Sequence, residues 1–154
     1  METTKLIIDT LSAVLVPIIA ILTAYIAYQQ YRTNKNRLRF ELYDKRFEIY
    51  LSIKTFISYI VSKADVDIDR AFQFLRETRE AEFLFDKEIL EYTDEMYKKA
   101  LKIHAIVASY ESLPTGDRRT ELVNEQLSLV TWFSSQVEIA SKKFSKYLSL
   151  KDLN

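Results

Sequence analysis

Apolar residues run almost without interruption through a segment near the start of the chain. Leu6–Tyr28 contains 23 residues, of which only Asp9 is charged. As a helix rising about 1.5 Å per residue, it would be about 34 Å long, enough to cross a hydrocarbon core of about 30 Å. Between residues 11 and 28, only Ser12 and Thr23 are polar without being aromatic. The pattern predicts one transmembrane helix.

Two other structures compete with a membrane anchor. One is a buried helix of a soluble bundle, which would normally carry a polar stripe on its solvent side. The other is a cleaved signal peptide, which has a positive start and small residues three and one positions before the cut. Here Glu2 and Asp9 outweigh Lys5, and Ala24 and Ala27 have the wrong spacing. We therefore expect an anchor.

Aromatic and then basic residues mark the end of the apolar segment. The predicted membrane-interface residues are Tyr25, Tyr28, Tyr31, Arg32, Lys35, Arg37 and Arg39. Tyrosines gather at membrane–water interfaces, and basic residues stay on the cytoplasmic side. We therefore expect residues 1–31 to be an anchor with its amino terminus outside, and residues 32–154 to be a cytoplasmic helical domain.

Contact with lipid explains the basic residues after the anchor more simply than binding of nucleic acid does. Lys and Arg beside a membrane interact with anionic lipid head groups at about 1 kcal/mol each. We therefore expect the bilayer as a partner, and no nucleic acid. Inside the span, Ala20, Ala24 and Ala27 form a stripe of small residues, a pattern that lets helices approach closely. They are candidate helix–helix contacts between copies of the chain.

The remaining residues show helical periodicity broken by short polar turns. Helices are expected over residues 36–61, 68–85, 86–113 and 118–148, with Asp65 or Asp67 capping the second and Asp117 the last. The sequence therefore predicts an all-α protein, in which the transmembrane helix continues into an antiparallel bundle of about four helices.

The expected buried faces follow from the same periodicity. In the first helix they are Phe40, Tyr43, Phe47, Tyr50, Ile57 and Val61, widened by Leu42, Ile49, Ile53, Phe56 and Ile60. In the second they are Phe72 and Leu75, and in the third Ile89, Tyr92, Met96, Ala100, Ile103 and Val107. In the last they are Val123, Leu127, Val130, Phe133, Val137, Ala140, Phe144 and Tyr147.

Composition disfavours most enzyme classes. The chain has one glycine, two prolines and no cysteine, which excludes a glycine-rich phosphate loop and a thiolate metal site. Its only histidine, His104, lies beside Ile103 on an apolar face and is expected to be half-buried and structural. The residue three before it is Leu101, so the Glu-x-x-His motif of di-metal bundles is missing. We expect no catalytic site, cofactor, metal or small-molecule substrate.

Charge is unevenly distributed although the formal total is zero. Residues 32–63 have a net charge of +5 and residues 64–112 a net charge of −5. The densest phrase is "RETREAEFLFDKE", in which Arg76, Arg79, Glu80 and Glu82 are a candidate partner surface. The alternative is a solvated face paired with itself, because Arg76 and Glu80 have the spacing of neighbours on a helix.

Three phrases carry a resemblance to a known family. They are "LYDKRFEIY", "FQFLRETREAEFLFDKEI" and "TWFSSQVEIASKKFSKYLSL". They resemble an uncharacterised family of short bacterial inner-membrane proteins with one amino-terminal span and a cytoplasmic helical domain. The resemblance covers nearly the whole chain. It implies this layout and a bacterial inner membrane, and it implies no activity and no functional residue.

Two functions fit these features. The first is a membrane-tethered interaction or scaffold module without catalytic activity, which binds itself or a protein partner at the inner membrane. The alternative is a membrane-perturbing effector whose transmembrane helices oligomerise and depolarise the cell. Asp9 and Pro17 would matter for the alternative, because a charged or kinked span conducts more easily.

Overall fold

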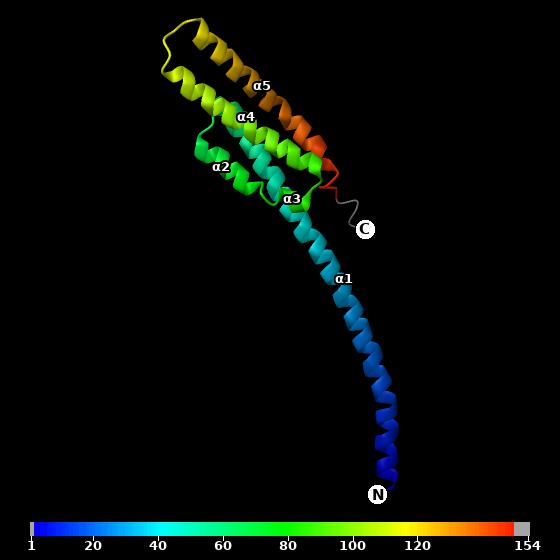
Figure 1. The fold of residues 1–154 in the computed structure, drawn as a ribbon. Helices are drawn as coiled ribbons and strands as arrows, with labels where there is room; N and C mark the ends of the chain where they lie inside the picture. The colour runs from blue at the N-terminus through cyan, green and yellow to red at the C-terminus, as the bar shows by residue number, and fades with distance from the viewer. Residues whose placement is uncertain (1, 150–154) are drawn as a thin grey trace. The chain divides into compact units, whose positions relative to one another are not determined.

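A computed structural model describes residues 2–149 of the chain (Figure 1). Its elements are α1 (Glu2–Lys63), α2 (Ile68–Glu77), α3 (Ala81–Leu84), α4 (Lys87–Glu111) and α5 (Asp117–Ser145). Across the described residues every regular element is a helix, which confirms the all-α prediction. The chain divides into two compact units, and the boundary falls inside α1 between Glu41 and Leu42.

One hydrophobic core holds the second unit together. The end of α1 contributes Ile53, Phe56 and Ile60, all fully buried. Phe56 stacks on Phe74 of α2 with 4.1 Å between ring centroids, and it meets Phe133 of α5 edge-on at 6.2 Å. Two consecutive helices and a third from much later in the chain therefore meet at one aromatic side chain.

Helix α4 packs against three of the other helices. It contacts α2, α3 and α5, and Figure 1 shows α4 and α5 side by side. The ion pairs Lys143–Glu88 (2.5 Å) and Lys102–Glu125 (2.6 Å) show that α4 and α5 run in opposite directions. The predicted inner face of α4 is confirmed: Ile89, Tyr92, Met96, Ala100 and Ile103 are buried and Val107 is half-buried.

The turn after α1 is made without glycine. Ala64 has a positive φ of 52°, and its amide donates to the carbonyl of Ile60 at 2.8 Å, an arrangement that ends helices. The side-chain amide of Gln126 donates to the Ala64 carbonyl. His104 Nδ1 lies 2.9 Å from the carbonyl oxygen of Val66, so the expected half-buried, hydrogen-bonded histidine is confirmed.

The caps agree only partly with expectation. Asp67 is the N-cap of α2, as predicted, but its carboxylate accepts a hydrogen bond from the Tyr59 hydroxyl at 2.8 Å rather than from the helix. The N-cap of α5 is Gly116, so the prediction of Asp117 was wrong by one residue. Gly116 has a φ of 168°, which is extended backbone, and a Cβ placed there would meet nothing within 4 Å.

The expected face of α2 was wrong. Phe72 and Leu75 are 43% and 46% exposed, and the buried residues are Ala71 and Phe74. Stacking on Phe56 fixes Phe74 toward the core, and Ala71 lies one turn earlier on the same side. Phe72 and Leu75 are therefore turned toward the surface.

The predicted buried faces of α1 and α5 are correct for some residues and wrong for others. On α1, Phe40, Phe47 and Val61 are exposed, while Ile49, Ile53, Phe56, Ile57 and Ile60 form the core. On α5, Val123, Leu127 and Val137 are exposed, while Leu122, Gln126, Leu129 and Gln136 are buried. The two glutamines lie inside because each amide bonds a main-chain carbonyl, that of Ala64 or of Trp132.

The aromatic contact at the centre of the core predicts a large loss of stability on truncation. Phe56→Ala should lower the free energy of unfolding by about 3–5 kcal/mol, because it removes a fully buried ring and leaves a cavity. Phe47→Ala, the same change at an exposed site on the same helix, should cost about 1 kcal/mol or less. Unfolding of the full chain in mild detergent, followed by Trp132 fluorescence, measures both. Equal effects would contradict the described core.

One buried hydroxyl lacks a partner, and this predicts a stabilising substitution. Among the described residues, Tyr92 Oη is the only buried side-chain polar atom without a hydrogen bond. Tyr92→Phe removes the unpaired group and keeps the ring, so the free energy of unfolding should stay equal or rise by up to about 1 kcal/mol. Tyr97→Phe, at a half-buried position of the same helix, is the control. A loss above about 1 kcal/mol at position 92 would show that the hydroxyl is bonded.

Candidate functional site

The apolar segment of the first unit is uncovered. All described side chains from residue 13 to residue 31 are exposed. Thr23, the one polar residue between residues 13 and 28 that is not aromatic, donates its hydroxyl to the carbonyl of Ile19 at 2.8 Å, so its hydrogen bond is made inside the helix. Among the described residues, α1 is the helix long and apolar enough to cross a membrane, by length and composition.

The predicted interface residues follow one another along α1. Tyr25, Tyr28 and Tyr31 are exposed, as are Arg32 and Lys35. Arg37 is also exposed and pairs with Glu41 at 2.8 Å, whereas Arg39 is half-buried. The candidate contact residues Ala20, Ala24 and Ala27 are exposed on the same helix. The membrane role of all these residues stays a prediction.

A groove lies in the second unit between α2–α3 and α4. Its volume is about 750 Å³. The α2–α3 side contributes Leu75, Arg76, Thr78, Arg79, Ala81 and Glu82, and α4 contributes Lys87, Leu90, Glu91, Thr93 and Asp94. The hydroxyls of Thr78 and Thr93 already donate to the carbonyls of Phe74 and Leu90 at 2.9 and 3.0 Å. The floor is therefore largely apolar, with charged side chains around its rim.

The groove brings together three of the four residues predicted as a partner surface. Arg76, Arg79 and Glu82 line it, and Glu80 is exposed in the turn beside it. Of the alternative, a solvated face paired with itself, the exposure is seen but the pairing is not. Helix α2 ends at Glu77, so Arg79 and Glu80 lie in a turn, and no ion pair joins Arg76 to Glu80 or Arg79 to Glu82 in the part of the chain that the structure describes.

Sequence reasoning missed the apolar part of this site. The floor needs Leu75 to face outward, which the periodicity did not indicate. The turn at residues 78–80 contains no glycine or proline that would signal a helix end. Phe83, on the short helix α3, is 80% exposed, a higher fraction than any other large apolar side chain in the described residues.

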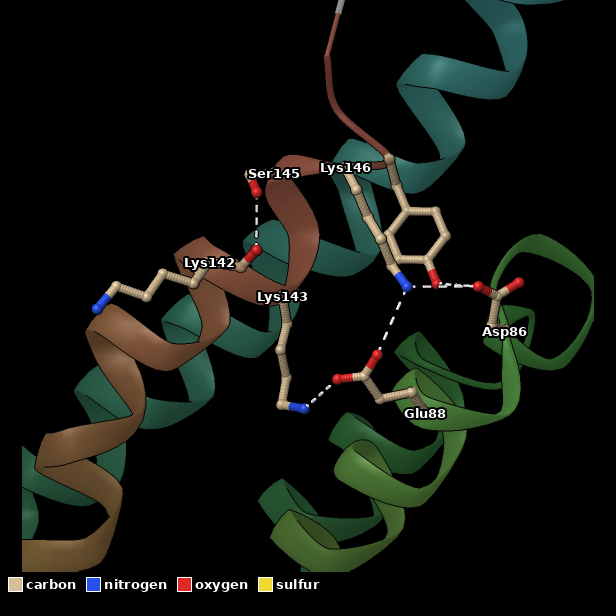
Figure 2. Close-up of polar contacts among 7 residues, drawn as sticks. Asp86, Glu88, Lys142, Lys143, Ser145 and Lys146 are labelled. Atoms are coloured by element: carbon tan, nitrogen blue, oxygen red, sulfur yellow. Dashed lines mark hydrogen bonds and ion pairs between the residues drawn. The ribbon is translucent and has the colours of Figure 1, made fainter.

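A charged corner joins the start of α4 to the end of α5 (Figure 2). Asp86 accepts hydrogen bonds from the Tyr147 hydroxyl at 2.8 Å and from Lys146 at 3.4 Å. Glu88 pairs with Lys143 at 2.5 Å, while Lys142 points away from both carboxylates. The corner connects residues about 60 positions apart, so it helps to fix α5 against α4.

The corner changes the acidity of its carboxyl groups. The hydrogen bond from Tyr147, followed by that from Lys146, lowers the pKa of Asp86. The hydrogen bond from Lys143 lowers the pKa of Glu88. Behind them, Arg46 of α1 donates to the carbonyl of Leu84 at 3.1 Å. This arrangement holds the start of α4 against the end of α5.

Comparisons with known proteins add nothing to this geometry. No protein family, curated protein or solved structure matches the chain. The resemblance to short bacterial membrane proteins therefore stays a prediction. Within residues 2–149, the side chains that the structure describes include no group of three or more His, Cys, Asp or Glu that could hold a metal ion.

The charged corner predicts an acid-sensitive part of the stability. Both carboxyl groups have a pKa below their ordinary values of 3.8 and 4.5, so their contribution is complete above those values and is lost as the pH falls below them. The melting temperature should therefore fall less steeply between about pH 5 and about pH 3 in Asp86→Asn/Glu88→Gln than in the parent chain.

The control for this measurement is Glu138→Gln, which removes a carboxylate whose ion pair with Lys142 lies within α5 alone. This substitution should leave the difference in melting temperature between high and low pH closer to that of the parent chain. An unchanged pH dependence in the double variant would show that the corner does not link protonation to folding.

Proposed function

We propose that the protein is a single-span, membrane-tethered helical interaction module without catalytic activity. One observation carries the proposal: the apolar side chains of residues 13–31 are uncovered. Eight of them, from Val14 to Ile26, are aliphatic and about half exposed. Burying such a side chain completely is worth about 1.5–3 kcal/mol, so the eight leave roughly 6–12 kcal/mol of burial unused in water.

That free energy is as large as the stability of an ordinary domain, about 5–15 kcal/mol. A soluble chain would have to bury this surface or aggregate, whereas a lipid bilayer covers it completely. A core helix would have its apolar side chains inside the protein, and here none of those in the apolar window is buried. These facts support a membrane span over a soluble core helix.

The surroundings of the span support its orientation and location. Exposed tyrosines and basic side chains follow it on α1, as in proteins whose next domain is cytoplasmic. We infer a bacterial inner membrane, with the amino terminus outside and the helices after the span inside the cell. In this proposal those helices form an antiparallel bundle, and the groove between α2–α3 and α4 is its binding surface.

Membrane extraction tests the proposal. The full chain should stay in the membrane pellet after alkaline carbonate treatment, because lipid covers its apolar segment. Residues 32–154 alone should appear in the supernatant, and a chain with Ile19→Lys and Leu22→Lys should be extracted at least in part, since charge inside the bilayer is costly. Exposed Ser128→Lys on α5 is the matched control and should stay with the membrane.

A carboxy-terminal tag tests the sidedness in the same cells. The tag should resist protease added to intact spheroplasts and become sensitive after lysis. Recovery of the intact full chain in the carbonate supernatant would overturn the anchor. Digestion of the tag from outside would overturn the orientation while leaving the anchor in place.

A further inference from the structure

We propose that the face around α3 is a self-complementary contact between two copies of this chain, in which Phe83 of each copy enters the groove of the other. The inference rests on the proposed function, because the shared membrane brings the copies together. It names the partner of the binding surface and the residues that meet there.

The apolar part of the face contains both a projection and a recess. Phe83 projects with 80% of its surface exposed, and the groove with Leu75, Ala81 and Leu90 lies beside it. Phe72 of α2 is also exposed on the adjoining helix. Exposed aromatic side chains next to an apolar groove are typical of protein contact surfaces rather than of free surface.

The charges on this face balance one another. Arg76, Arg79, Glu80 and Glu82 are all exposed, and in the residues that the structure describes no ion pair involves any of the four. The carboxylates on the α4 rim differ, because Glu91 and Asp94 are paired with Lys87 and Lys98 on their own helix. Two cations and two anions are therefore left for a partner.

Balanced charge fits a second copy of this chain as the partner. In a two-fold contact the same patch of both copies forms the interface. If residue i of one copy contacts residue j of the other, then residue j of the first copy contacts residue i of the second. Arginines of one copy can then lie against glutamates of the other, in both halves of the contact. A strongly acidic or basic partner would instead be matched by a surface with an excess of one sign.

Anchoring makes a small contact sufficient. A patch of one turn and two short helices presents few side chains, and small interfaces are weak in solution. Chains confined to one membrane have a much higher effective concentration, so a weak contact becomes populated. We therefore expect dimers in membranes and little association of the dilute protein in detergent.

Cysteine crosslinking in native membranes tests the contact, since the chain has no cysteine of its own. Phe72→Cys on this face should give at least about five times more bis-maleimide-linked dimer than Ser128→Cys on exposed α5. In the Phe72→Cys background, Phe83→Ser should reduce the dimer strongly. Leu127→Ser, which removes an exposed leucine from α5, is the matched control and should not.

Charge-reversal substitutions distinguish this contact from any other self-association. Arg76→Glu/Arg79→Glu and Glu80→Arg/Glu82→Arg should each lose the dimer, because like charges then face each other. Co-expression of the two variants with different tags should restore a mixed dimer, because opposite charges meet again. Trp132 fluorescence melting of each variant checks that it is folded.

Three results would overturn the contact. They are equal crosslinking at residues 72 and 128, no rescue in the mixed sample, or a dimer that responds only to Ala24→Leu in the span. If the chain is extracted by carbonate but the mixed dimer forms, the membrane proposal fails and the contact stands. If the chain stays in the membrane without rescue, the contact fails and the membrane proposal stands.

Discussion

The stacking of Phe56 on Phe74, with the edge of Phe133 against it, is the interaction on which the helical domain depends. It joins α1 and α2, which follow one another in the chain, to α5, which is remote from both in the sequence, and it fixes the rotation of α2 about its own axis. Because Phe74 faces inward, Leu75 faces the groove and Phe72 the surface. The groove therefore exists as a consequence of how the core is packed.

The sequence was informative where apolar and polar residues separate cleanly. On α4 the spacing from Ile89 to Ile103 identified the buried face, and the helical periodicity of the chain correctly predicted an all-α protein. It was misleading on α5, where Gln126 and Gln136 are buried and Leu127 is exposed. A glutamine can occupy a core when a main-chain carbonyl accepts its amide hydrogen, and that carbonyl is invisible in a local pattern.

The candidate site could also be predicted only in part from the sequence. The charged residues Arg76, Arg79 and Glu82 were recognised from their density in the sequence, and the structure brings them to one groove. The groove itself depends on a helix end at residues 78–80, where the chain has no breaker, and on packing between α2 and α4. Local chemistry could be read from the residues, whereas the recess between helices required tertiary contacts.

The only glycine of the chain lies where its special flexibility is not needed. Gly116 has an extended backbone and nothing within 4 Å of a Cβ placed on it, and among the described residues a positive φ occurs at Ala64 instead. Exposed connections of this kind tolerate added residues. The α4–α5 connection is therefore the natural place to splice in a fluorescent protein or an epitope, or to open new chain ends, with both helices left intact.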